Sequence, residues 1–347
     1  MAKTAVVLFN LGGPDRPEAV QPFLFNLFFD PAIIRLPLPL RWLLARFISK
    51  RRAPAAQEIY REMGGGSPLL PNTEAQAAAL ATALQEDKGL GEFRVFIAMR
   101  YWHPRARETV RQVAAFAPDQ VILLPLYPQF STTTTGSSLQ EWQREAEAAG
   151  LKATTRALCC YPEETGFVDA VVAGLRDALR RVEGDKPPRV LFSAHGLPKK
   201  IIDGGDPYQW QVEQSVAAVL GRLGEVNLDW QICYQSRVGP LEWIGPATDS
   251  EIEAAGREGR PIIVVPVAFV SEHSETLVEL DIEYRHLAEE AGASVYIRVA
   301  TAGTEAAFIA GLAGLVGRAI AAGRPVCSQV GGRRCPAEWR GCPQAVA

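Results

Sequence analysis

The chain has 347 residues, which is enough for two domains of ordinary size. Its 36 basic and 39 acidic residues nearly balance, so it lacks the basic surplus that nucleic-acid binding requires, and nucleic acid is not an expected partner. We predict no signal or transit peptide, and the longest apolar region, residues 23–48, is too interrupted by charges and prolines to span a bilayer. The six cysteines indicate a globular protein of a reducing compartment, where clustered thiols more often hold metal than form disulfides.

Apolar runs typical of buried strands recur along the chain, and the second half repeats the first in the same order. Residues 6–14, 95–104 and 121–131 correspond to residues 190–198, 230–240 and 262–272. Long apolar runs indicate strands that are buried on both faces of a parallel sheet. The intervening helical patterns cover residues 74–84, 105–115, 167–182, 212–223 and 304–321.

We therefore predict an α/β fold of two similar doubly wound, Rossmann-like domains with parallel sheets, and an active site in the cleft between them. The domains cover residues 1–150 and 160–320; the first carries an apolar insertion near residues 15–65, and residues 321–347 form a cysteine-bearing extension. Ligands of such sheets bind beyond the carboxyl ends of the strands. The polar residues expected there are Asn10, Arg100, Tyr101, Gln129, His195, Gln235, Glu272 and His273.

Acidic residues recur within the segment SEHSETLVELDIEY, residues 271–284, which follows an apolar run. Glu275, Glu279 and Glu283 are spaced by four, which places them on one face of an α-helix and more nearly in line on a π-helix. A column of carboxylates suits a hard divalent cation, and an acidic helix face in water is the alternative. His195 ends a predicted strand and is a candidate base that accepts protons near neutral pH.

Eight groups of motifs in order resemble the ferrochelatase family over almost the whole chain. They are FNLGGP at 9–14, SKRRAP at 49–54, YREMGGGSPL at 60–69, RYWHP at 100–104, YPQFSTTTTGSS at 127–138, SAHGLP with GGDPY at 193–208, QSRVGPLEWIGP at 235–246, and SEHSETLVELDIEY at 271–284. The resemblance implies an enzyme that inserts ferrous iron into protoporphyrin IX, giving protohaem and two protons.

The resemblance also assigns site residues. His195 takes the pyrrole protons and Glu275 joins it at the iron. Glu279 and Glu283 extend a carboxylate path for iron entry or proton exit, with His273 and Glu272 at its entrance; the side from which metal arrives stays open. The apolar insertion supplies lips for the porphyrin, the alternative being an amphipathic helix packed on the core. The implied porphyrin-binding residues are Leu11, Arg51, Arg52, Tyr60, Ser67, Arg100, Tyr101, Gln235 and Trp243.

Three cysteines, Cys327, Cys335 and Cys342, lie within the last 21 residues and require a fourth ligand from elsewhere to complete a metal site. Cys159 and Cys160 are the candidates. Adjacent residues of an extended segment point to opposite faces, so we expect only one of the two to ligate, and the sequence does not choose between them. Some ferrochelatases hold a [2Fe–2S] cluster with such a set, which the resemblance implies here; zinc is the rival.

Because no signal or transit peptide is predicted, we expect the protein in the cytoplasm, with its lips touching the inner membrane. The sequence leaves two other functions open. One is a chelatase that acts on coproporphyrin or inserts cobalt, and the other is a non-enzymatic haem carrier or iron–sulfur sensor. The presence of both His195 and Glu275 disfavours a carrier, which needs no base facing a metal ligand. The oligomeric state, the iron donor and the role of the cluster stay open.

Overall fold

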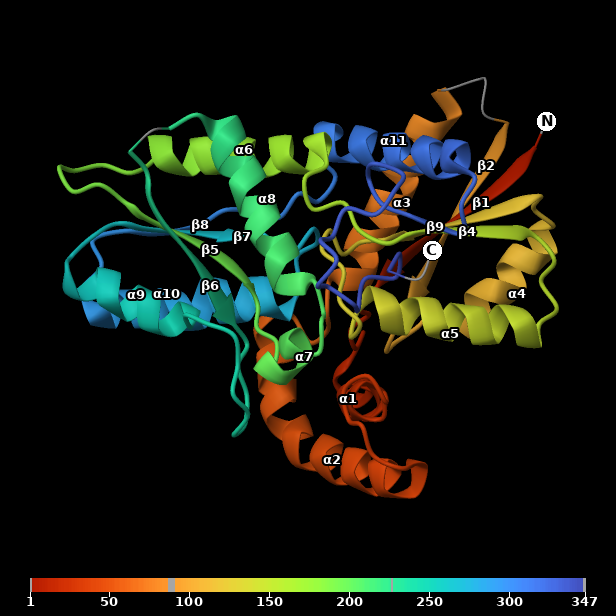
Figure 1. The fold of residues 1–347 in the computed structure, drawn as a ribbon. Coiled ribbons are helices and arrows are strands. Elements are labelled where there is room, and N and C mark those ends of the chain that lie inside the picture. The colour runs from red at the N-terminus through yellow and green to blue at the C-terminus, as the bar shows by residue number, and fades with distance from the viewer. Residues whose placement is uncertain (1, 87–90, 226, 346–347) are drawn as a thin grey trace. The chain divides into compact units, whose positions relative to one another are not determined.

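The computed structural model describes residues 2–86, 91–225 and 227–345. The chain divides into two compact units, each with its own parallel sheet (Figure 1). Unit 1 contains residues 1–160 and 313–333, and unit 2 contains residues 161–312 and 334–347.

The sheet of unit 1 has five parallel strands in the order β2-β1-β3-β4-β9. The strands are β1 (Lys3–Asn10), β2 (Glu92–Met99), β3 (Gln120–Pro125), β4 (Thr154–Leu158) and β9 (Val326–Cys327). The central strand β1 is buried from Ala5 to Asn10, as the unbroken apolar run predicts for a strand covered on both faces. Because β9 pairs with β4, part of the C-terminal segment belongs to this sheet.

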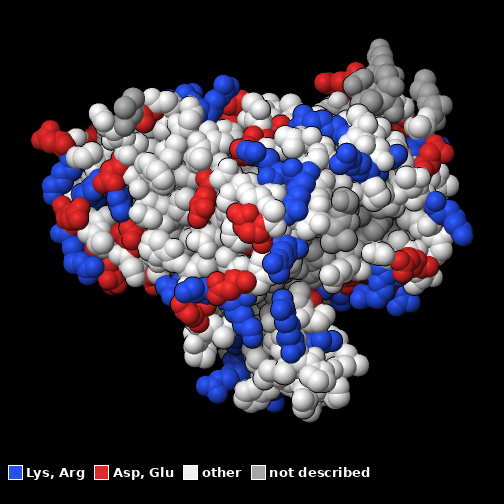
Figure 2. Space-filling view, viewed as in Figure 1, with Lys and Arg blue, Asp and Glu red and all other residues white. Residues whose placement is uncertain are grey.

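The segment between β1 and β2 begins with two helices, α1 (Val20–Phe28) and α2 (Leu38–Glu62). We call residues 20–62 the apolar hairpin. The ring of Phe25 packs edge-on against Trp42 at 6.4 Å between centroids, which joins the two helices. At the bottom of Figure 2 the hairpin presents a largely uncharged surface bordered by Lys and Arg side chains. Pro54 lies within α2, where it removes one backbone donor.

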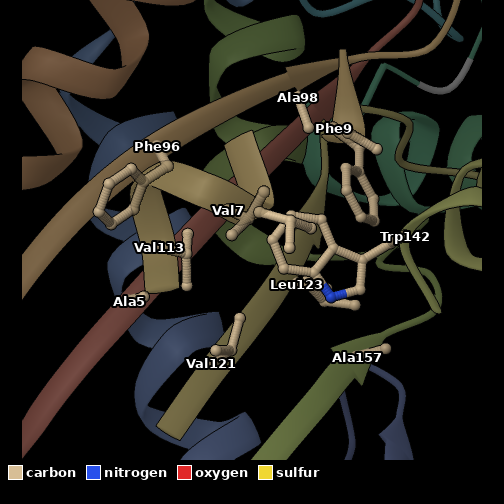
Figure 3. Close-up of a cluster of buried hydrophobic side chains, with 12 residues drawn as sticks. Ala5, Val7, Phe9, Phe96, Ala98, Val113, Val121, Leu123, Trp142 and Ala157 are labelled. Carbon is tan, nitrogen blue, oxygen red and sulfur yellow. The ribbon is translucent and has the colours of Figure 1, made fainter. Parts of the chain in front are cut away.

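Alternate side chains of β1 form the core of unit 1 on the sheet face that packs against α4 (Ala106–Phe116) and α5 (Thr135–Ala148). Figure 3 shows Phe9 beside Trp142, with their ring centroids 6.0 Å apart, and Val7 in the same cluster. The helix α3 (Leu69–Glu86) packs on β2. This packing fixes the carboxyl ends of β1 and β2, from which the loops with Leu11 and Arg100 emerge.

The sheet of unit 2 has four parallel strands in the order β6-β5-β7-β8. The strands are β5 (Arg189–His195), β6 (Asp229–Gln235), β7 (Ile262–Pro266) and β8 (Tyr296–Arg298). Within this unit, α6 and α8 lie on one face and α9 and α10 on the other (Figure 1). The helices are α6 (Thr165–Arg180), α7 (Lys199–Asp203), α8 (Tyr208–Leu223), α9 (Thr248–Arg257), a π-helix η2 (Glu275–Glu283), α10 (Tyr284–Ala291) and α11 (Ala306–Ala322), whose last residues belong to unit 1.

The two sheets confirm the predicted α/β class and the internal repeat. The order β2-β1-β3-β4 in unit 1 matches β6-β5-β7-β8 in unit 2, and the three predicted strand pairs occupy equivalent positions. The five helices expected from periodicity are all present. No helix in the described part of the chain is both long and apolar enough to cross a membrane.

Candidate active site

His195 ends β5, and its imidazole faces the first carboxylate of the π-helix. Its Nε2 lies 3.8 Å from Oε1 of Glu275, and Nε2 of His273 lies 3.8 Å from Oε2 of the same carboxylate. The fold brings these residues together because β5 and β7 are neighbours in the sheet and the loop after β7 leads into the π-helix. Glu275 is thus a carboxylate placed between two imidazoles.

Both imidazoles turn Nε2 toward Glu275 because backbone carbonyls hold the other ring nitrogen. Nδ1 of His195 lies 2.6 Å from the oxygen of Gly196, and Nδ1 of His273 lies 3.1 Å from the oxygen of Ser271. A carbonyl only accepts, so Nδ1 carries the hydrogen, and Nε2 of the neutral ring keeps its lone pair. Each Nε2 is therefore arranged to accept a proton or to bind a cation.

The charge of Glu275 is stabilised by its two neighbours. Burial alone raises the pKa of Glu275, but His195 and His273 outweigh it and lower this pKa to about 2. Burial lowers the pKa of His273, but the hydrogen bond to Glu275 and the charge of Glu275 raise it by more. The pKa of His273 is therefore above its usual value. A carboxylate that stays ionised favours a proton on the adjacent ring. Its Oε2 accepts no hydrogen bond from the described residues.

Several donors surround Glu279, the next carboxylate of the column. Its Oε1 accepts from the backbone nitrogen of Ser236 at 2.7 Å and from the hydroxyl of Tyr284 at 3.2 Å. Its Oε2 accepts from Gln235 at 3.0 Å and from the Ser236 hydroxyl at 2.5 Å. Burial and the charge of Glu275 raise the pKa of Glu279, and the donors offset this only in part. This carboxyl is therefore more easily protonated than its neighbour.

Ser236 holds Glu279 from a backbone conformation that is uncommon for any residue with a side chain. Its φ is +61°, in the left-handed region. Gln235, which precedes it and which the resemblance assigned to porphyrin binding, is fully buried. The Gln235 amide also donates to the backbone oxygen of Glu275 at 3.1 Å and accepts from Ser193 at 2.8 Å. The end of β6 thus supports the first turns of the π-helix.

Arg298, the last residue of β8, ties down the π-helix and the loop before it. Its guanidinium donates to Oδ1 of Asp281 at 3.0 Å and to Oδ2 at 2.5 Å, a bidentate pair, and to Oε1 of Glu272 at 2.7 Å. The same Glu272 oxygen accepts from the backbone of Thr301 at 2.9 Å. Burial raises the pKa of Glu272, but Arg298 outweighs it and the pKa falls below its usual range. Glu272 is thus bound within the fold.

The column of three carboxylates runs on a π-helix, one of the two helix types that the spacing allowed. Glu275 and Glu279 are half-buried, whereas Glu283, at the end of the π-helix, is exposed. A π-helix has an i to i+5 hydrogen-bond pattern, so residues four apart lie close to one line along its axis. The structure therefore provides a graded line of carboxylates from the two imidazoles to the surface of unit 2.

Trp243 lies next to the turn that follows His195. The segments containing Pro198 and Trp243 pair in an antiparallel bridge, and a Cβ placed on Gly196 would lie 3.2 Å from the indole and 2.9 Å from the oxygen of Gln235. Glycine is thus required after His195 for this close approach. Tyr208 on α8 donates to the backbone oxygen of His195 at 3.1 Å.

In unit 1 the structure gathers several of the residues that the resemblance assigned to the porphyrin. Leu11, Tyr60 and Tyr101 belong to one apolar cluster with α1 and α2. Ser67 lies against Gly13, since a Cβ there would meet its hydroxyl at 2.4 Å. Arg51 and Arg52 are exposed on α2. The hairpin thus packs directly on the loop after β1.

Sequence reasoning missed five residues that hold these groups in place. Asp30 could have been found, because it is a lone acid within an apolar and basic segment. An acid that is buried in such a segment requires a partner for its charge. The others, on β-strand ends and helix faces, carried no distinguishing pattern of their own. The missed residues are Asp30, Ser236, Asp281, Tyr284 and Arg298.

Three cysteines meet in unit 1. Cys159 and Cys327 are joined by a backbone hydrogen bond of 2.8 Å. The sulfur atoms of Cys159 and Cys160 are 3.4 Å apart, so the expectation that they point to opposite faces is wrong: β4 ends at Leu158 and both follow it outside the ladder. Burial first, and then Cys160, raise the pKa of Cys327 to about 11.

In unit 2, Cys335 and Cys342 are both buried, and the sulfur of Cys335 accepts from Gln211 at 3.2 Å. Across the described ranges, no group of three or more His, Cys, Asp or Glu side chains has the spacing of a preformed metal site. Cys233 is buried in β6, and burial raises the pKa of its thiol to about 12. That thiol is therefore an inert apolar side chain.

Comparison with known proteins gives a consistent family. A family model described as Ferrochelatase matches residues 3–320. A ferrochelatase of Caulobacter vibrioides is 55% identical over 98% of this chain and 97% of its own length; one of Phenylobacterium zucineum is 57% identical over 90% of each. Among solved structures, SirB from Bacillus subtilis with Fe3+ has a TM-score of 0.51 at 13% identity over 92% of this chain and 96% of its own, a likeness of fold alone.

Proposed function

Because the chain belongs to the ferrochelatase family and inserts iron into a porphyrin for haem synthesis, we propose that His195 and Glu275 perform this step. A free-base porphyrin carries two N–H protons at its centre, and both leave when Fe2+ binds the four nitrogens. The single observation that supports the assignment is the pair of imidazole Nε2 atoms, each 3.8 Å from one oxygen of Glu275.

In the proposed mechanism Nε2 of His195 accepts the pyrrole protons, one at a time. Its lone pair is available because Nδ1 is held by the oxygen of Gly196. The ionised Glu275 stabilises the imidazolium, as its lowered pKa of about 2 indicates. Protons then pass to Glu279, whose raised pKa suits a carrier, and to the exposed Glu283.

Anaerobic incubation with ferrous iron and protoporphyrin IX tests the function. Loss of free-base fluorescence is expected with many turnovers per protein molecule, above a protein-free control. Parallel rates with coproporphyrin test the substrate, because the apolar hairpin favours the porphyrin with fewer carboxylates. Faster turnover of coproporphyrin, or of cobalt, would contradict the substrate assignment. Tight binding without insertion would indicate a carrier.

We propose that the apolar hairpin touches an anionic membrane surface, so that the protein is cytoplasmic and peripheral to the membrane. Leu40, Leu43, Leu44 and Phe47 share one face of α2 and are exposed, with Phe47 at 63%. Residues 31–57 carry six basic and no acidic side chains. Exposed apolar side chains beside uniform positive charge suit an interfacial helix on anionic lipid.

Replacing Leu43 and Phe47 together with glutamine is expected to weaken binding to phosphatidylglycerol–phosphatidylcholine vesicles by roughly 10-fold or more, since each buries apolar area in the lipid. Co-sedimentation measures this. Val330→Gln is the matched control, because Val330 is a 62% exposed apolar residue of unit 1 outside the hairpin. Equal binding of all three proteins would refute the membrane contact.

We also propose a [2Fe–2S] cluster on Cys327, Cys335, Cys342 and either Cys159 or Cys160. The donor set fits: all five thiols are buried, and thiolates are the ligands such clusters use. Two contacts within unit 1 support the proposal, the 3.4 Å between the sulfur atoms of Cys159 and Cys160 and the backbone hydrogen bond from Cys159 to Cys327, although the described residues contain no preformed group of three metal ligands. When bound, the cluster would link the four thiolates covalently and would also supply a one-electron redox couple.

The purified protein is expected to be brown, with visible absorption that dithionite bleaches. Cys327→Ser should lose this colour, because it removes one of the four thiolates. Cys233→Ala is the control, since Cys233 is a buried thiol of β6, and it should keep the colour. Separate serine variants of Cys159 and Cys160 identify the ligand. A colourless protein that contains zinc would exclude the iron–sulfur cluster.

A further inference from the structure

Asp30 is a buried acid in the turn that joins the two helices of the apolar hairpin, and it is 4% exposed. Its Oδ1 accepts from the backbone nitrogen of Ala32 at 2.9 Å and so shapes the turn. Its Oδ2 accepts from Arg100 at 2.7 Å, from the hydroxyl of Tyr101 at 2.8 Å and from the hydroxyl of Ser137 at 2.6 Å. One carboxylate therefore joins the hairpin to the end of β2 and to α5.

Each of the three guanidinium nitrogens of Arg100 makes a contact within this network. Its Nη2 meets Asp30, its Nε donates to Ser137 at 2.7 Å, and its Nη1 lies 3.1 Å from Glu141. Its plane also lies over the Tyr101 ring, 4.9 Å from the centroid. A carboxylate of a porphyrin is bound best through two N–H groups of one guanidinium edge. Each nitrogen of Arg100 already faces an oxygen of the protein.

Releasing Arg100 to a ligand would leave Asp30 buried without its cation, which is strongly unfavourable. Tyr101 is constrained in the same way, because its hydroxyl points to Asp30 and its backbone oxygen accepts from Asn26 of α1 at 3.0 Å. Arg51 and Arg52, by contrast, are exposed on α2. The polar groups of Arg100 and Tyr101 thus serve the protein, and the exposed pair remains for ligand carboxylates.

We propose that Asp30 is a positioning residue that fixes the apolar hairpin for porphyrin binding, with Arg100, Tyr101 and Ser137 holding its carboxylate and not the porphyrin. The inference rests on the proposed function and changes the role that the resemblance gave to Arg100 and Tyr101. The charge on Asp30 keeps the hairpin in the arrangement that packs on the loop after β1, through the shared apolar cluster.

The test compares Asp30→Asn with Glu58→Gln, a control in which an exposed acid of α2 loses its charge. Asparagine keeps the side-chain volume but removes the charge. The donors of Arg100, Tyr101 and Ser137 then face either an NH₂ group or a neutral oxygen. We expect KM for protoporphyrin IX to rise about 10-fold with a smaller fall in kcat, because the groups in unit 2 are unchanged. Hydrogen–deuterium exchange should quicken over residues 20–62 and stay unchanged in β1 and β3. Unchanged KM and exchange would overturn the proposal.

Tyr101→Phe perturbs the same network less than Asp30→Asn does. It therefore tests the proposal even if Asp30→Asn does not fold. Phenylalanine keeps the ring and removes only the hydroxyl. If Tyr101 serves Asp30, KM should rise roughly 3- to 5-fold, the effect of one lost hydrogen bond, and hairpin exchange should quicken. If Tyr101 acts by stacking on the porphyrin, neither should change, and the proposal fails.

A double-variant comparison separates positioning from direct contact. Arg100→Gln should raise KM in the natural background and change it little in Asp30→Asn, because both substitutions break the same pair. An equal rise in both backgrounds would show that Arg100 binds the porphyrin directly. The exchange measurement needs no substrate, so it tests the anchor even if the unaltered protein fails to insert iron, an outcome that refutes only the proposed function.

Discussion

Replacing His195 with alanine is expected to lower kcat for iron insertion by about 10²- to 10⁴-fold, the usual contribution of a positioned acid–base group. The side chain offers Nε2 to a proton because its Nδ1 is held by the oxygen of Gly196, and the ionised Glu275 stabilises the charge that forms. The measurement is the steady-state rate of anaerobic loss of porphyrin fluorescence at saturating porphyrin and iron. Porphyrin binding, followed by fluorescence titration, should be retained.

His286→Ala is the matched control for this experiment. His286 is exposed on α10, beyond the carboxylate column, and its loss should leave turnover within about twofold, as for a surface substitution. Retained insertion in His195→Ala would remove His195 from the mechanism and would turn attention to His273, the other imidazole that faces Glu275. Loss of both binding and turnover would instead show a damaged fold.

The sequence predicted three strands of each sheet, because the signal of a long apolar run is local, and it did not predict the short strands β4, β8 and β9. Unbroken apolar runs identify strands buried on both faces, and the order of three such runs in each half predicts which strands correspond. The spacing of Glu275, Glu279 and Glu283 predicted one line of carboxylates on a helix, of α or π type, and the structure shows that the helix is a π-helix. These features depend on residues within a few positions of one another.

The partners of buried charges could not be predicted in the same way. Asp30 meets Arg100 and Ser137 across 70 and 107 residues of sequence, so no short-range pattern marks them as a group. The two adjacent cysteines show that a local rule also fails at the end of a strand. Alternation holds within a strand, and Cys159 and Cys160 lie just after one, where the backbone departs from the ladder. Sequence patterns therefore do not predict the partners of buried charges that are distant in sequence, or the direction of side chains just beyond a strand.

Replacing Arg298 with methionine is expected to destabilise the fold by about 3–5 kcal/mol, since it leaves Asp281 and Glu272 without their buried cation. The side chain of Arg298 is 10% exposed and holds both carboxylates. Urea unfolding monitored by circular dichroism measures the loss. Arg257→Met is the control: Arg257 reaches Glu253 at 3.4 Å, but its side chain is 68% exposed, so the loss should be about 1 kcal/mol or less.

The pH dependence distinguishes loss of this charge pairing from loss of packing. The pKa of Glu272 is lowered in the fold, so its pairing stabilises the protein above the unfolded value near 4.5, and the stabilisation is lost as pH falls toward the folded value. In Arg298→Met, protonation of Glu272 removes the charge that has lost its partner and so relieves the cost of burying it. The difference in unfolding free energy between the variant and the natural protein should therefore be largest near neutral pH and shrink below about 4.5. A difference that is constant with pH would assign the role of Arg298 to packing, and the carboxylates of the π-helix would then need another source of stabilisation.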